Sequence, residues 1–170
     1  MKAMVVYDSV HGNTEQVAQA VAEAVGRALG SPEEGPTPLA CETRRVTEID
    51  PEQLPDLDVL IVGAPTHALQ PSPAAKAFLK GIPSGALKGV RVAGFDTRLD
   101  VEETGPGILI FVTRIFGYAA KPIADRLRRK GGALALPPEG FIVEDTEGPL
   151  REGELERAAE WASAIGEAKA

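Results

Sequence analysis

Several residue types are scarce in this chain of 170 residues, and each scarcity excludes a class of protein. The single cysteine, Cys41, excludes a disulfide scaffold and a metal centre built from several thiolates. Lys and Arg number 18 against 25 Asp and Glu, and a net charge of −7 is unfavourable for gripping nucleic-acid phosphates, so no nucleic-acid partner is expected. Aromatic residues make up only 5% of the chain, which limits where rings can stack on a ligand.

No apolar run is long enough to cross a membrane. The longest stretch covers Ile108 to Val112, whereas a membrane helix needs about 20 apolar residues. The apolar run near the N-terminus, Ala3 to Tyr7, is also too short for the core of a secretory signal. We therefore expect a cytoplasmic protein without a membrane span. The length and the 25% of charged residues predict one globular domain over residues 1–170.

The chain does contain an alternation of short apolar runs with helical patterns. Strand-like runs cover 3–7, 41–46, 59–63, 90–95, 133–136 and 141–143, the last two separated by two prolines, and helical patterns cover 17–29, 73–80, 108–129 and 155–165. Five strand–helix units predict an α/β fold with an open, doubly wound, five-stranded parallel sheet and helices on both faces. Ligands of such sheets bind beyond the carboxyl ends of the strands, from which we expect three loops to leave, at 8–14, 64–71 and 96–107.

The first of these loops, Asp8 to Thr14, has the composition of an anion site. Ser9 and Thr14 supply hydroxyls, Asn13 supplies an amide, and Gly12 lets the backbone approach a phosphate closely. Free backbone N–H groups at the start of the following helix would attract the same anion. The loop holds no Lys or Arg, so we expect neutral donors alone to hold a phosphate there.

Spacing excludes several better-known loops at this position. A Walker A loop needs Gly-Lys-Ser/Thr, but Asn13 follows Gly12, and the dinucleotide fingerprint needs three spaced glycines. Cys41 stands too far away for a cysteine phosphatase loop, and Gly63-Ala64 stand where a phospho-receiver domain would place an aspartate. An ordinary strand-to-helix turn would also explain Gly12 taken alone.

The whole string Tyr7-Asp8-Ser9-Val10-His11-Gly12-Asn13-Thr14-Glu15 resembles the phosphate loop of the flavodoxin family, Tyr-x-Ser/Thr-x-Thr-Gly-Asn-Thr-Glu. His11 departs from this pattern, because the family has a hydroxyl residue there. Downstream, Gly63-Ala64-Pro65-Thr66 resembles the family's Gly-x-Pro-Thr turn, which lies against the flavin ring. The resemblance implies a flavodoxin-like fold with strand order 2-1-3-4-5. It also implies a noncovalently bound FMN that exchanges electrons with a redox partner protein.

The resemblance further implies which residues surround the FMN. The phosphate would be held by Ser9, His11, Gly12, Asn13 and Thr14, and Val10 would also belong to the FMN site. The ring would lie against Pro65, Thr66, His67, Ala68, Asp96, Thr97, Arg98 and Leu99. No side chain is assigned a catalytic role. Neither histidine has a carboxylate or cysteine at metal-ligand spacing, so no metal site is expected.

The aromatic shortage falls on the two loops that would contact the ring. Neither 64–71 nor 96–107 contains Phe, Tyr or Trp, although flavodoxin carriers commonly hold the ring between aromatic side chains. Arg98 near the ring would favour an anionic reduced flavin, unless it forms an ion pair with Asp96 or Asp100. We therefore expect a less strongly reducing site and leave two alternatives open. One is an FMN-dependent NAD(P)H reductase or oxidase acting on a quinone-like or porphyrin-like substrate, and the other is a degenerate flavodoxin-like module without flavin.

Overall fold

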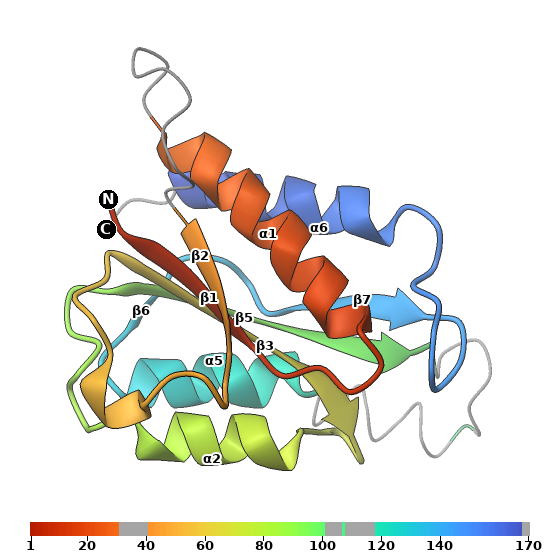
Figure 1. Ribbon diagram of the computed structural model, residues 1–170, viewed down its shortest axis with the longest axis horizontal. Helices are drawn as coiled ribbons and strands as arrows, with labels where there is room; N and C mark the ends of the chain where they lie inside the picture. Colours follow the sequence, from red (N-terminus) through yellow and green to blue (C-terminus); the bar gives the residue numbers. More distant parts are fainter. Residues whose placement is uncertain (31–40, 101–106, 108–117, 168–170) are drawn as a thin grey trace.

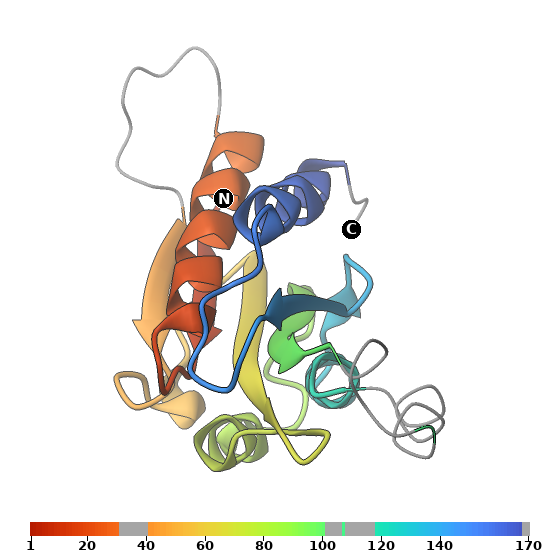
Figure 2. The ribbon, with the colours of Figure 1, turned by 90° about the vertical axis from the view of Figure 1, so that its right-hand side faces the viewer.

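The computed structural model describes residues 1–30, 41–100, 107 and 118–167, which form a central sheet with helices on both sides (Figures 1 and 2). The strands are β1 (Ala3–Tyr7), β2 (Cys41–Arg45), β3 (Val59–His67), β4 (Gln70–Pro71), β5 (Arg91–Leu99), β6 (Ala133–Leu134) and β7 (Glu139–Val143). The helices are α1 (Asn13–Leu29), α2 (Pro73–Gly81), α5 (Ala120–Arg129) and α6 (Glu154–Ser163), with short 3₁₀ turns at Pro51–Gln53 and Ala164–Gly166.

The sheet has the order β2-β1-β3-β5-β6, all of it parallel, which confirms the predicted strand order. The fifth position is shared by two short strands, because β6 pairs with the start of β5 and β7 pairs with its end. Pro137 and Pro138 separate β6 from β7, and proline has no N–H to donate to a strand ladder. The antiparallel β4 extends the sheet at the end of β3.

Successive residues of the central strands point into two different cores. Val5 of β1 packs under α1 and α6, whereas Val6 packs against the side covered by α2 and α5 (Figure 2). Strands buried on both faces read as continuous apolar runs, as Val59–Val62 does. Because α1 and α6 cover one face and α2 and α5 the other, the predicted doubly wound arrangement is confirmed.

Two strands extend further than the apolar runs indicate. β3 continues to His67 and turns back into β4, and β5 continues to Leu99, so parts of the expected loops 64–71 and 96–107 are strand. The backbone explains the difference, because Ala64 and Pro65 stay in register with residues of β5 and Leu99 stays in register with β7. Ladder hydrogen bonds from neighbours extend a strand whatever the polarity of its side chains.

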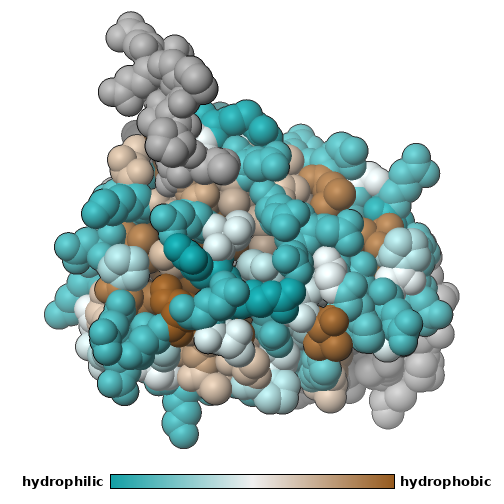
Figure 3. Space-filling view, in the orientation of Figure 1, coloured by the Kyte–Doolittle hydropathy of each residue, from teal (hydrophilic) through white to brown (hydrophobic). Residues whose placement is uncertain are grey.

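The predicted helix over 108–129 appears as α5 from Ala120 onward, and residues 108–117 of that prediction lie outside the described residues. Pro122 falls in the first turn of α5, where a missing N–H costs no intrahelical bond. None of the described helices is long and apolar enough to cross a membrane. Hydrophilic side chains cover most of the face in Figure 3, with hydrophobic ones only in small separate patches.

Candidate functional site

The loop between β1 and α1 is shaped by Ser9 and Gly12. Gly12 precedes the first residue of α1 with φ 87°, a left-handed conformation that disfavours any residue with a Cβ. The Ser9 hydroxyl oxygen accepts hydrogen bonds from the backbone N–H groups of Gly12 at 3.1 Å and Glu15 at 3.4 Å. Its proton is therefore left to donate. The helix itself offers no acceptor for the N–H groups of Asn13 and Thr14, so the loop presents several donors to an anion.

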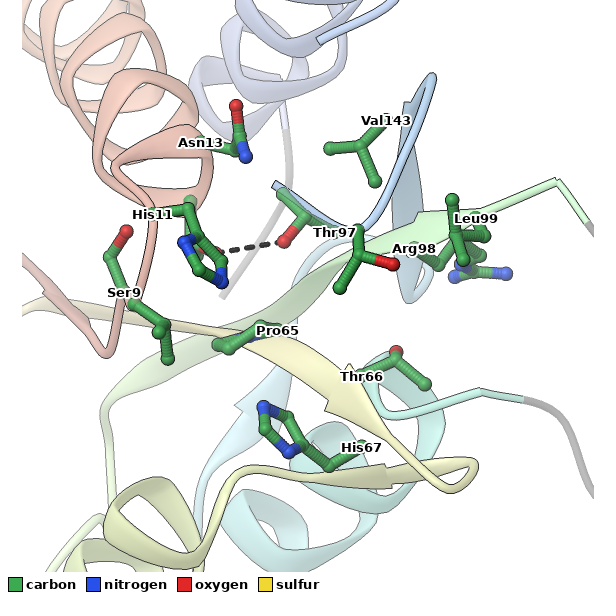
Figure 4. Close-up of a pocket in the computed structure, with 13 residues that line it drawn as sticks. Ser9, His11, Asn13, Pro65, Thr66, His67, Thr97, Arg98, Leu99 and Val143 are labelled. Carbon is green, nitrogen blue, oxygen red and sulfur yellow. Dashed lines mark hydrogen bonds between the residues drawn. The ribbon is translucent and has the colours of Figure 1, made fainter. Parts of the chain in front are cut away.

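A cavity of about 250 Å³ opens at the carboxyl ends of β1, β3 and β5 (Figure 4). The strand order changes direction between β1 and β3, and ligands of open α/β sheets bind at this topological switch point. Eleven of the fourteen residues named from the resemblance line it, and Gly12, Ala68 and Asp96 do not. The lining residues are Ser9, Val10, His11, Asn13, Thr14, Pro65, Thr66, His67, Thr97, Arg98, Leu99, Val143 and Thr146.

A buried hydroxyl pair connects the loop after β1 to the end of β5. Thr14 Oγ1 and Thr97 Oγ1 lie 2.8 Å apart, and the two residues are 2% and 5% exposed (Figure 4). Only one of the two protons is used between the oxygens, so the other is left for a further acceptor. The hydrogen bond thus connects two walls of the cavity, and one hydroxyl of the pair can still donate to a ligand.

Thr66 contributes the one buried side-chain polar atom that lacks a hydrogen-bond partner among the described residues. Its Oγ1 is inaccessible to solvent, and the residue lines the cavity near the end of β3. An unpaired buried hydroxyl costs about 1–3 kcal/mol, so such atoms are rare unless a ligand or water pairs with them. Thr66 therefore keeps an unused hydroxyl in the wall of the cavity.

The buried Asp96 forms an ion pair with Arg98, which is partly exposed and lines the cavity. The Arg98 Nε and Nη2 donate to the two Asp96 carboxylate oxygens at 2.6 and 2.9 Å, and the Ala120 N–H donates to the same carboxylate at 2.7 Å. Burial raises the pKa of Asp96, while Arg98 and the Ala120 amide act against that rise. The Arg98 guanidinium also lies 3.9 Å from the centre of the Tyr118 ring. Of the two ion-pair partners expected for Arg98, Asp96 and Asp100, the structure shows the pair with Asp96.

Gly140 of β7 makes room for this ion pair. A Cβ built there would lie 1.9–2.1 Å from atoms of the Arg98 guanidinium, so any side chain at this position would displace the guanidinium. Tyr118, just before α5, places its ring against Arg98. The end of β5 is therefore locked by contacts from both α5 and β7.

Sequence reasoning missed Arg45, which lies next to the phosphate-loop candidate. Arg45 ends β2, and its Nη1 donates to the Ser9 carbonyl oxygen at 3.2 Å. Its Nη2 lies 2.5 Å from a carboxylate oxygen of Glu15. The neutral donors expected in the loop therefore have a cation beside them, which comes from a neighbouring strand and does not line the cavity. No local signal marks this residue, since it comes from a weakly patterned edge strand.

Sequence reasoning also did not indicate that the end of β7 and the residues after it belong to the site. Val143 and Thr146 line the cavity, and the Asn13 side-chain amide donates to the Glu147 carbonyl oxygen at 3.1 Å. Gly148 has φ 107°, and a Cβ there would lie 2.6 Å from the Asn13 side-chain oxygen. The pairing of β7 with β5 and the packing of α6 on α1 bring this segment over the start of α1, so nothing near residue 13 in sequence could have indicated it.

The two histidines line the cavity on either side of Pro65 (Figure 4). Within the described part of the chain, no group of three or more His, Cys, Asp or Glu side chains is arranged to hold a metal ion. The cavity combines hydroxyls, the Asn13 amide, two imidazoles and the Arg98 guanidinium with aliphatic walls.

No protein-family model and no curated protein matches the sequence. Solved structures do match, however. A flavodoxin from the domain Archaea superposes with a TM-score of 0.71 at 18% identity, covering 98% of this chain and 97% of that one. Oxidised flavodoxin 1 from Bacillus cereus superposes with a TM-score of 0.69 at 18% identity, covering 100% of both chains.

The rubredoxin oxygen:oxidoreductase of Desulfovibrio gigas also matches, with a TM-score of 0.67 at 18% identity. The match covers 98% of this chain but only 35% of that protein. At sequence identities this low, structural similarity is evidence for a shared fold and not for a shared activity. On its topology and on these superpositions, the chain has the flavodoxin-like fold.

Proposed function

We propose that this protein binds FMN noncovalently in the cavity and carries electrons to or from a redox partner protein. One observation carries the proposal: the cavity runs from the start of α1 to the ends of β3 and β5, and Thr66 in its wall has a hydroxyl without a partner among the described residues. A ligand with a phosphate at one end and a polar ring at the other would find donors at both ends. FMN has this shape, and when bound it supplies one- and two-electron transfer.

The phosphate end is formed by the loop after β1. The Ser9 hydroxyl, the free member of the Thr14–Thr97 hydroxyl pair and the first N–H groups of α1 all have a donor to spare. His11 lines the same end, and its imidazole replaces the hydroxyl of the family pattern. Gly12 contributes its left-handed backbone rather than a side chain, which accounts for its absence from the cavity lining.

The ring end lies between the ends of β3 and β5. Pro65 and Thr66 approach from one strand, and Leu99 of β5 and Val143 of β7 from the others. Because Asp96 takes up the charge of Arg98, we expect a weaker preference for an anionic reduced flavin than Arg98 alone would give. Asp96 does not line the cavity and would influence the ring through its ion pair with Arg98. Ala68 does not line it either and has a left-handed backbone in the turn after His67.

The proposal is tested by loading the purified protein with FMN and passing it through a gel-filtration column. We expect flavin absorbance to elute with the protein, and titration should quench the flavin fluorescence at micromolar concentration. The double variant Ser9→Ala/Thr14→Ala should lose FMN, whereas Thr47→Ala/Ser84→Ala, which removes two exposed hydroxyls, should keep it. If the wild-type protein releases FMN at micromolar concentration, the chain is a flavodoxin-like module without flavin and the proposal is wrong.

The walls of the cavity favour a second candidate. No aromatic side chain is among its lining residues in the described part of the chain, and the ring end has the aliphatic Pro65, Leu99 and Val143. Such walls suit a flat second substrate, as in an FMN-dependent NAD(P)H reductase acting on a quinone. Turnover of NAD(P)H with a soluble quinone by the FMN-loaded protein would support the reductase, and a carrier would show none.

A further inference from the structure

The contacts of Arg45 place it behind the phosphate loop rather than inside the cavity. β1 and β2 pair in register, with Tyr7 opposite Arg45, so the side chain leaves the end of β2 beside Ser9. Its guanidinium donates to the Ser9 carbonyl oxygen at 3.2 Å and lies 5.4 Å from the centre of the Tyr7 ring. Its backbone N–H is held at 3.0 Å by a carboxylate oxygen of Glu48. Both the backbone and the guanidinium of Arg45 are therefore held by hydrogen bonds.

Glu15 shares the same guanidinium. One of its carboxylate oxygens lies 2.5 Å from Arg45 Nη2, while its backbone N–H donates to the Ser9 side chain at 3.4 Å. Burial of Tyr7, and next the Glu15 carboxylate beside it, raise the pKa of the Tyr7 hydroxyl, so Tyr7 adds no negative charge near neutral pH. The positive charge behind the loop is thus offset by one carboxylate in the first turn of α1.

Building on the proposed function, we infer that Arg45 positions the loop for the FMN phosphate and that Glu15 sets how much of the Arg45 charge the phosphate experiences. The bond from Arg45 fixes the Ser9 backbone, and the Ser9 hydroxyl in turn orients the N–H groups of Gly12 and Glu15. A phosphate monoester carries about two negative charges at neutral pH. It would therefore respond both to the loop geometry and to the net charge of this pair.

Comparing FMN with riboflavin, which lacks the phosphate, distinguishes a role of Arg45 at the phosphate from a general effect on stability. The hydrogen bonds, ion pair and ring contact of Arg45 involve residues of the β1–β2 side, and none involves a lining residue of β3 or β5. Loss of Arg45 should therefore weaken binding of FMN, which has the phosphate, and leave binding of riboflavin, which lacks it, unchanged. A merely structural role would weaken both ligands alike.

The first test titrates Arg45→Met and Arg45→Lys with FMN and with riboflavin, following flavin fluorescence. Methionine keeps an apolar stem over Tyr7 but removes both donors, so we expect FMN binding to weaken about tenfold and riboflavin binding to stay within about twofold. Lysine keeps the charge and one donor, and should restore part of the loss. Arg44→Met is the matched control, because Arg44 precedes Arg45 on β2 and pairs with Glu42 at the surface.

The second test uses Glu15→Gln, which keeps an acceptor for Arg45 but removes the offsetting charge. We expect FMN to bind about threefold more tightly or better, and the gain to shrink as salt is raised. Riboflavin should not respond. Glu23→Gln is the control, since Glu23 lies two turns further along α1 and pairs with Arg27 at the surface.

The possible failures are distinguishable. Equal weakening of FMN and riboflavin by Arg45→Met, or no gain for FMN in Glu15→Gln, overturns this inference and leaves the proposed function standing. A wild-type protein that binds riboflavin as tightly as FMN overturns the role of Arg45 and the phosphate site together. Failure of the wild type to bind either flavin overturns the proposed function and this inference with it.

Discussion

At the scale of single residues, the hydroxyl pair of Thr14 and Thr97 combines a structural and a binding role. Thr97→Val keeps the branched shape of the side chain but leaves the Thr14 hydroxyl, in a residue only 2% exposed, without its 2.8 Å partner. We expect the free energy of unfolding to fall by about 1–3 kcal/mol and FMN to bind more weakly. Urea unfolding and FMN titration measure the two effects.

Thr47→Val provides the control for this substitution. Thr47 is exposed, so the same chemical change should alter the free energy of unfolding by less than about 0.5 kcal/mol. Equal stability of Thr97→Val and the wild-type protein would show that the buried pair contributes nothing, and the coupling between the two cavity walls would have to be abandoned.

At the scale of elements, the turn between β3 and β4 is under backbone strain. Ala68 and Leu69 have φ values of 46° and 63°, and the pairing of His67 with Gln70 makes them the two central residues of a tight hairpin. Such hairpins favour Asn or Gly, because a left-handed conformation costs an ordinary residue about 1–2 kcal/mol. The strain lies beside His67, at the rim of the cavity.

Ala68→Gly should relieve this strain and raise the free energy of unfolding by about 1 kcal/mol, seen as a higher melting temperature. The matched control is Ala77→Gly, which makes the same change at an exposed site inside α2 and should lower stability by about 1 kcal/mol. If both variants are destabilised alike, Ala68 is not strained in solution.

The junction of β7 and α6 gives stability a pH dependence. Burial acts to raise the pKa of Glu154, but hydrogen bonds from Arg157 and from the Ile142 N–H outweigh it, and the pKa is lowered. The folded state therefore holds this proton less tightly than the unfolded chain does. The resulting stability is complete above the ordinary Glu pKa of about 4.3 and is lost as the pH falls through the lower folded-state pKa.

Glu154→Gln should accordingly destabilise the protein by about 2 kcal/mol at pH 7, and by progressively less as the pH falls below about 4. Urea unfolding of both proteins across this pH range measures the difference. Glu156→Gln, an exposed change in the same turn of α6, should give a small and nearly flat difference. A difference for Glu154→Gln that grows in acid would contradict the lowered pKa.

The elements also show where sequence reasoning succeeds. The buried strands were predicted well, because burial on both faces leaves an unbroken apolar run such as Val59–Val62. The ends of β3 and β5 were not, since their extension depends on ladder bonds to β5 and β7 rather than on their own polarity. Arg45 and Val143 reach the site through strand pairing, and Thr146 follows β7. Neither kind of placement leaves a mark on the local sequence.

At the scale of the whole molecule, the cavity lies between parts that are distant along the chain. Its lining comes from the start of α1, from the ends of β3 and β5, and from β7 and the residues after it. These segments are held together by β1–β3, β3–β5 and β5–β7 pairing, so the site forms only when these four strands have paired. A ligand that contacts all of them should therefore stabilise the fold as a unit.

FMN should raise the melting temperature of the whole domain in one cooperative step. A ligand that binds only the folded state adds about 2.7 kcal/mol at 100 times its dissociation constant, or about 5–10 °C for a domain of this size. Riboflavin and inorganic phosphate each reach only one end of the cavity, so each should shift the transition less than FMN at equal concentration. Heat denaturation followed by circular dichroism, together with the fluorescence of the single tryptophan, Trp161, reports both the sheet and the α6 layer. If FMN shifted only one of the two signals, the cavity would stabilise part of the molecule, and the sheet would not be the unit that the ligand holds together.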